Sequence, residues 1–225
     1  MYIDIAFIVS LLIVAIPFYF LGYNKISNAA DSQKYVAILF VVGIIIGFIT
    51  AYATLYLLII SVNALSLIVL VLSLMLIAIM HTLLIYIILK SDLLPKKRYY
   101  PYYGLAFGSG LALVEGGEEL YVLVSGRFTY LSIAGFLFVS GWIILLSVVG
   151  YTTGYLIKKN NLMNTILYTS AVIFIFYIIS ISIFSGIDWL VYLSSILAIL
   201  SSLIYLYLTI AKMGKIEKIV KLLKL

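Results

Sequence analysis

Long apolar runs follow one another along almost the whole of this 225-residue chain, and they restrict its fold more than any other feature. An α-helix needs about 20 mostly apolar residues to cross the hydrocarbon of a bilayer, and several runs here are that long. Hydrophobic residues make up 66% of the chain and charged residues 10%, which leaves too little polar surface to cover a soluble globule. The sequence therefore predicts an all-α, polytopic membrane helix bundle.

Polar and proline breaks divide the apolar runs into about seven transmembrane helices. The run 36–90 is too long for one span, and Ser61-Val62-Asn63 is its polar break, so we expect a tight helical hairpin there. Pro95 and Pro101 bracket the next loop. The predicted helices cover residues 3–23, 36–61, 64–90, 101–125, 130–157, 163–185 and 188–211.

The basic residues predict how the helices are oriented. Thirteen of the fourteen Lys and Arg residues lie in the first, third and fifth loops or in the C-terminal segment, and only Arg127 lies on the other side. The positive-inside rule then places the N-terminus outside and the C-terminus in the cytoplasm of a multi-pass cell-membrane protein. This distribution also explains the net charge of +6 without a nucleic-acid partner.

Two segments at the ends of the chain carry further predictions. Residues 1–211 form a single transmembrane bundle, and residues 212–225, with lysine at every third position, form a basic amphipathic tail on the anionic cytoplasmic leaflet. The first helix lacks the basic start of a signal peptide. Cleavage after Ser27-Asn28-Ala29 remains the alternative for that helix.

Three of the eight acidic residues lie within five positions of the helix predicted at 101–125: Glu115, Glu118 and Glu119. A carboxylate at membrane depth costs at least about 2.5 kcal/mol on insertion scales, so a compensating partner is required. Gly104, Gly108, Ala112, Glu115 and Glu119 share one helical stripe, and the small residues allow a neighbouring backbone to approach closely. We therefore expect the glutamate face to pack inside the bundle.

Two further features bear on a site there. Gly116-Gly117 lies beside the glutamates, and glycine pairs favour a local break that would free backbone carbonyls near the carboxylates. His81 is the only histidine. The helices predicted at 64–90 and 101–125 are consecutive and antiparallel, which makes them expected neighbours and allows His81 to approach Glu115.

Each of these residues also has a plainer interpretation. His81 is equally compatible with a hydrogen-bonded packing role, which is common for a lone histidine in a membrane helix. Glu118 and Glu119 are compatible with a hydrated position near the outer interface, where Arg127 would pair with one of them. Glu115 lies deepest and is the hardest to explain in this way.

The segment Gly104-Leu-Ala-Phe-Gly-Ser-Gly-Leu-Ala-Leu-Val-Glu115, followed by Glu118-Glu119, resembles the glutamate-bearing helices of PrsW-like and CAAX-prenyl-protease-like intramembrane peptidases. The resemblance implies a multi-helix peptidase that uses glutamate and histidine at membrane depth, with Glu115, Glu119 and His81 as catalytic residues. It covers about sixteen residues, and those families have histidines on more than one helix, whereas this chain has His81 alone.

Three functional classes follow from the sequence. The first is a small carrier or channel in which Glu115, Glu118, Glu119 and His81 bind a cation, a proton or a proton-coupled solute. The second is the peptidase, and the third is an accessory subunit whose glutamates bind a basic residue of a partner helix. The expected partners are the lipid bilayer, a cation or small solute, and a membrane partner subunit or a second copy of the chain. No cofactor is expected, except zinc in the peptidase, because the chain has no cysteine and one histidine.

Overall fold

The computed structural model describes the backbone of residues 2–26, 30–63, 67–92, 94, 99–125, 131–159, 162–180 and 188–222. All the secondary structure in this part of the chain is helical. The helices are α1 (Tyr2–Ile26), α2 (Ala30–Asn63), α3 (Leu67–Lys90), α4 (Tyr100–Ser125), α5 (Leu131–Lys158), α6 (Leu162–Ser180) and α7 (Asp188–Leu222). The predicted all-α bundle is confirmed, with breaks close to those expected from the sequence.

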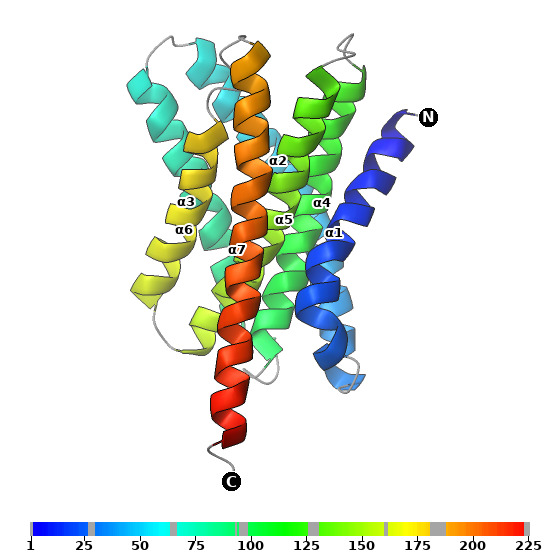
Figure 1. The fold of residues 1–225 in the computed structure, drawn as a ribbon, viewed down its shortest axis with the longest axis vertical. Helices are drawn as coiled ribbons and strands as arrows, with labels where there is room; N and C mark the ends of the chain where they lie inside the picture. Colours follow the sequence, from blue (N-terminus) through cyan, green and yellow to red (C-terminus); the bar gives the residue numbers. More distant parts are fainter. Residues whose placement is uncertain are drawn as a thin grey trace.

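Successive helices run in alternating directions, so the two chain ends lie at opposite ends of the bundle (Figure 1). The loops after α1, α3 and α5 lie at the end where α7 finishes, which is the end predicted to face the cytoplasm. Which end faces the cytoplasm remains a prediction from the charge distribution.

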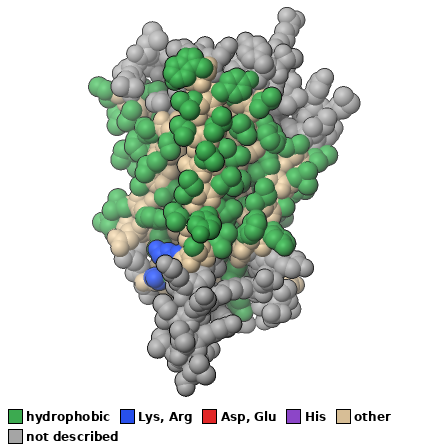
Figure 2. Space-filling model, in the orientation of Figure 1, with side chains coloured by type: hydrophobic (Ala, Val, Ile, Leu, Met, Phe, Trp, Pro, Cys, Tyr) green, Lys and Arg blue, Asp and Glu red, His purple; other side chains and the backbone are tan. Residues whose placement is uncertain are grey.

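Among the described residues, five helical segments are long and apolar enough to cross a membrane. They lie in α2, α3, α5, α6 and α7, and the described part of α1 adds a shorter apolar segment, Ile8–Leu21. Figure 2 shows hydrophobic side chains covering most of one face, with Lys or Arg only toward one end among the described residues. The outward display of large apolar residues is what a lipid-facing bundle requires.

Helices α4 and α5 form the centre of the bundle. Of the apolar segment in α5, 78% is buried, against 28–33% in the other four. Helix α4 packs chiefly on α5, α2 and α1, while α7 covers α5 and α3 packs mainly on α6 and α2. The site described below therefore lies on the most enclosed helices.

Glycines allow α4 and α5 to touch along their backbones. A Cβ atom at Gly104 would collide with the carbonyl oxygen of Gly150, and one at Gly150 would collide with that of Gly104. Gly108 and Gly154 continue this seam on either helix. The packing role predicted for Gly104 and Gly108 is therefore confirmed.

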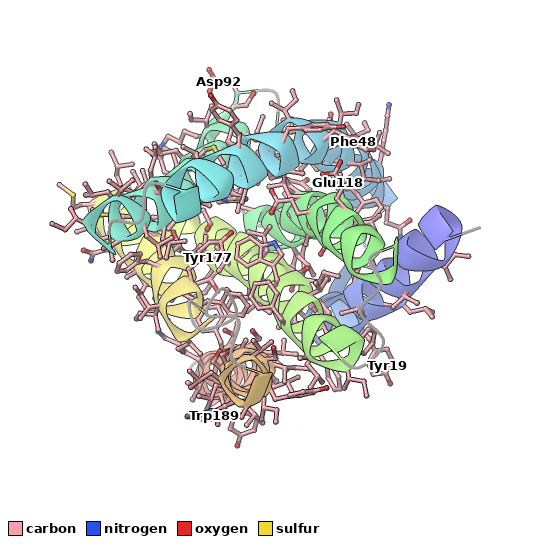
Figure 3. The ribbon with its side chains drawn as sticks, turned by 90° about the horizontal axis from the view of Figure 1, so that it is seen from above. Tyr19, Phe48, Asp92, Glu118, Tyr177 and Trp189 are labelled. Carbon is pink, nitrogen blue, oxygen red and sulfur yellow. The ribbon has the colours of Figure 1, made fainter. Side chains whose placement is uncertain are left out.

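A second seam, which the sequence analysis did not identify, joins α4 to α2. A Cβ atom at Gly43 would collide with the carbonyl oxygen of Phe107, and one at Gly110 with that of Phe40. Figure 3 shows α2 lying across one side of α4 in the view from above. Helix α4 is thus held between two close-packed partners, which fixes the direction in which its side chains point.

The break expected at Gly116-Gly117 is absent, because α4 is an uninterrupted helix through both residues. A Cβ atom at Gly116 would lie 2.5 Å from side-chain atoms of Ile143. This glycine makes room for Ile143 of α5 and leaves the helix intact. The prediction that a break here frees backbone carbonyl groups was therefore wrong.

The C-terminal segment continues α7 as helix to Leu222, with no interruption at residue 212. The side chains after Lys212 lie outside the described residues, as do those of Glu119 and Arg127. The position of the tail on the membrane surface therefore remains a prediction.

Candidate functional site: a buried histidine–glutamate pair

Four helices bring polar side chains together around Glu115. His81 comes from α3, Glu115 from α4, Thr50 from α2 and Trp142 from α5, and each is at most 3% exposed. Nε2 of His81 lies 2.8 Å from Oε1 of Glu115, so the predicted approach of these two residues is confirmed. The pair is enclosed by protein on all sides.

Close packing of the consecutive helices α3 and α4, which was expected to bring His81 to Glu115, is only partly present. Helices α3 and α4 touch, but each packs mainly on other helices. His81 reaches Glu115 across a narrow contact because the α2 and α5 seams fix α4 beside it, rather than because consecutive helices form a close pair.

Besides His81, two side chains in the described part of the chain donate hydrogen bonds to the Glu115 carboxylate. The Thr50 hydroxyl lies 2.5 Å from Oε1, and the Trp142 indole N–H donates to Oε2 over 3.1 Å. The single Thr50 proton has a second acceptor available, the carbonyl oxygen of Gly47 at 3.1 Å. These donors supply the compensation that a buried carboxylate needs.

The backbone of α3 determines which tautomer His81 adopts. Nδ1 lies 2.8 Å from the carbonyl oxygen of Ile77, and a carbonyl only accepts, so Nδ1 carries a proton. One further proton then lies between Nε2 of His81 and Oε1 of Glu115. Whether it resides on the nitrogen or the oxygen, the pair has no net charge, which reduces the cost of burying it.

Aromatic rings hold the imidazole in place. The Trp142 ring packs edge-on against His81, with centroids 5.5 Å apart and planes at 90°. Phe176 and Tyr177 of α6 pack on the other parts of Trp142, at 5.5 and 5.0 Å. Figure 3 shows Tyr177 directed into the bundle. The aromatic cluster excludes water from this side of the pair.

Glu118 occupies a less enclosed position than Glu115. It is half-buried and follows Glu115 by one turn on α4. In Figure 3 it lies on the side of α4 toward α2. Glu119 is helical in backbone, but its side chain and that of Arg127 lie outside the described residues, so the proposed pairing of Arg127 is not addressed.

The part of the chain that the structure describes contains no group of three or more His, Asp or Glu side chains that could hold a metal. The side chain of Glu119, the third catalytic residue implied by the peptidase resemblance, lies outside that part. Both nitrogens of His81 are already engaged, Nδ1 by Ile77 and Nε2 by Glu115. A metal at Nε2 would have to displace this hydrogen bond.

Thr50 and Trp142 are two members of the site that were not predicted from the sequence. Thr50 follows Gly47 by three residues and so shares the glycine face of α2, which is a signal that could have identified it. Trp142 lies in the middle of α5, although tryptophan in membrane helices is enriched near the interfaces. A tryptophan far from both helix ends indicates a buried partner for its N–H.

No family model, curated protein or solved structure matches this chain.

Proposed function

We propose that this chain is a multi-pass protein of the cell membrane that binds a proton at the His81–Glu115 pair and moves it as a small proton carrier or proton-coupled transporter. The observation that carries the proposal is the 2.8 Å contact between His81 and Glu115, both buried, with one proton between them. Histidine and carboxylate pairs inside membrane helices are the groups from which proton relays are built.

The contacts favour a proton over a metal cation. A cation needs oxygen lone pairs directed at it, whereas Glu115 accepts from the Thr50 hydroxyl and the Trp142 N–H and shares one proton with His81. Those donors would have to turn away before a cation could bind. A proton needs no such rearrangement, because Nε2 of His81 and Oε1 of Glu115 can each hold it at their present separation of 2.8 Å.

Polar groups continue from the pair in one direction. Helices α2 and α4 run in parallel away from the basic end. Glu118 follows Glu115 along α4 in that direction, and Thr54 follows Thr50 along α2. The Thr54 hydroxyl is buried with no hydrogen-bond partner among the described residues. A buried hydroxyl of this kind can be satisfied by an internal water. Together these groups would connect the pair to the outer end.

Reconstituted vesicles containing a trapped pH indicator test the proposal. Under an imposed pH gradient, wild-type protein should move protons, and both Glu115→Gln and the double variant Glu115→Gln/Glu119→Gln should abolish the flux. Asp92→Asn is the matched control, since it makes the same carboxylate-to-amide change at an exposed position after α3 and should leave the flux intact.

Two outcomes would overturn the proposal. Vesicles that stay tight to protons and to a panel of monovalent and divalent cations would exclude transport, and would favour an accessory subunit in which the pair joins helices. Cleavage of membrane peptides, lost with Glu115→Gln, would instead favour the divergent peptidase. Proton flux that survives the double replacement would place the path elsewhere in the bundle.

A further inference from the structure

A groove opens between α5, α6 and α7 at the basic end of the bundle, well away from the His81–Glu115 pair. Its volume is about 760 Å³, within the roughly 300–1,000 Å³ range of sites that enclose ligands. Helices α6 and α7 diverge toward this end in Figure 1, so the groove faces sideways from the bundle. In a membrane protein that side faces lipid.

The walls of the groove combine apolar length with aromatic hydroxyls. Leu167 of α6 and Leu208 of α7 line it and are 60% and 57% exposed, so they present apolar surface to whatever lies between the helices. Tyr155 of α5 and Tyr168 of α6 also line it. Tyrosine rings with an apolar body and a polar tip are typical of the depth at which lipid headgroups meet acyl chains.

The floor of the groove is formed without any ligand. The Tyr205 hydroxyl donates to Oγ1 of Thr152 over 3.0 Å, and the Thr152 hydroxyl donates to the carbonyl oxygen of Val148 over 2.9 Å. This chain of hydrogen bonds joins α7 to α5 and satisfies the polar groups at the base. A ligand would therefore enter a pre-formed cleft and would not have to order it.

The mouth of the groove is positively charged. Lys212 lines it and is exposed, and Lys159, also exposed, lies over the ring of the lining residue Tyr155 at 4.9 Å. Asn164 lines it from the first turn of α6, where helix N–H groups carry partial positive charge. The described acidic side chain at this end, Asp92, lies across the bundle from α7 in Figure 3.

From this arrangement we infer that the groove binds an anionic phospholipid, with an acyl chain between Leu167 and Leu208 and the headgroup phosphate at Lys159 and Lys212. Basic pockets between helices at the cytoplasmic face are suited to anionic headgroups. The inference does not depend on proton movement, because none of the groove residues contacts the pair.

Native mass spectrometry of protein taken from vesicles of phosphatidylglycerol mixed with phosphatidylcholine tests this site. We expect one phosphatidylglycerol per chain to be retained after detergent exchange. A lysine near the headgroup contributes roughly a fivefold change in affinity, so Lys212→Gln should weaken retention by about that factor and Lys159→Gln/Lys212→Gln by about twenty-five-fold.

The chain offers a matched control in Lys90→Gln, an exposed lysine at the same end of the bundle but on α3, outside the groove. This variant should retain lipid as the wild type does. Ala211→Trp, which places a large ring in the groove, should exclude the acyl chain while leaving the lysines in place. Glycerol phosphate alone should fail to compete, since it lacks the chain.

Three results would overturn the inference. Equal losses in Lys90→Gln and Lys212→Gln would show general attraction to the basic end. Equal retention of phosphatidylcholine would show that the charge of the headgroup is irrelevant. Undiminished binding in Ala211→Trp would show that the lipid lies outside the groove.

Discussion

Replacing Glu115 by Gln or by Ala should have sharply different effects on stability, because only glutamine can preserve the hydrogen bonds at the site. In Glu115→Gln, the amide oxygen can accept from Trp142 while the amide N–H₂ donates to Nε2 of His81 and to Oγ1 of Thr50. His81 keeps its Nδ1 proton on the Ile77 carbonyl. The Thr50 proton moves to the carbonyl oxygen of Gly47, 3.1 Å away.

The magnitudes follow from counting which groups lose a partner. In Glu115→Gln every group keeps one, so the free energy of unfolding should change by less than about 1 kcal/mol. In Glu115→Ala, Trp142 N–H and Nε2 of His81 are both left buried without a partner. At about 1–3 kcal/mol each, the loss should be roughly 2–6 kcal/mol, before any cavity is counted.

Reversible unfolding in mixed micelles, followed by helical circular dichroism, measures both changes. A double-mutant cycle with His81→Phe adds a check, because the two residues are in direct contact. Glu115→Ala and His81→Phe should cost less together than the sum of the two single changes, by about 0.5–3 kcal/mol. Each single change leaves the other residue without its partner, and the double change removes both.

Equal destabilisation by Glu115→Gln and Glu115→Ala would contradict this prediction. That result would mean that the pair is held as an imidazolium–carboxylate ion pair whose charges are essential, since glutamine supplies the hydrogen bonds and lacks the charge. Stability preserved together with loss of proton flux would separate the functional role of Glu115 from its structural one.

Three other predictions concern the packing, the orientation and the metal content of the protein. Gly104→Ala should lower the free energy of unfolding by about 1–3 kcal/mol or prevent assembly, because its Cβ atom would collide with the Gly150 carbonyl. Gly47→Ala should lower it less in the same unfolding assay, because its Cβ atom would lie 3.0 Å from the side chain of Val114. Reporter fusions at residues 1 and 225 should place the N-terminus outside and the C-terminus in the cytoplasm, and finding both on one side would contradict the seven-helix arrangement. Purified protein should carry less than one zinc per chain by elemental analysis; one tightly bound zinc, lost in His81→Ala, would favour the peptidase.

The fold was largely predictable because its determinants are local. A membrane helix is specified by the length and apolarity of its own segment, and its ends by nearby polar residues, so the seven helices could be placed without knowledge of their neighbours. The glycine seam is also locally determined. Gly104 and Gly108 on α4, like Gly150 and Gly154 on α5, are four residues apart, a spacing that indicates a close helix contact. What those patterns leave open is which helix each seam faces.

Gly116-Gly117 shows where this local reasoning failed. Glycine in a helix has two physical uses, to loosen the backbone or to admit a neighbour, and the sequence does not distinguish them. The choice depends on Ile143, which lies 27 positions after Gly116 and packs where a Cβ atom would be. Tertiary contact keeps α4 helical here, although glycine lowers the intrinsic preference for helix by about 1 kcal/mol relative to alanine.

The site divides in the same way between predictable and unpredictable parts. A buried carboxylate must find donors, so the cost of Glu115 predicts that partners exist, and the lone His81 was an evident choice for one of them. Thr50 and Trp142 were not evident, because hydroxyl and indole groups are common in membrane helices and most of them have other uses. Their selection depends on the α2–α4 and α4–α5 seams, which bring both helices close enough to donate to one carboxylate. The two glycine seams are thus part of the site: any change that separates these helices should remove the donors of Glu115 even where every polar residue is kept.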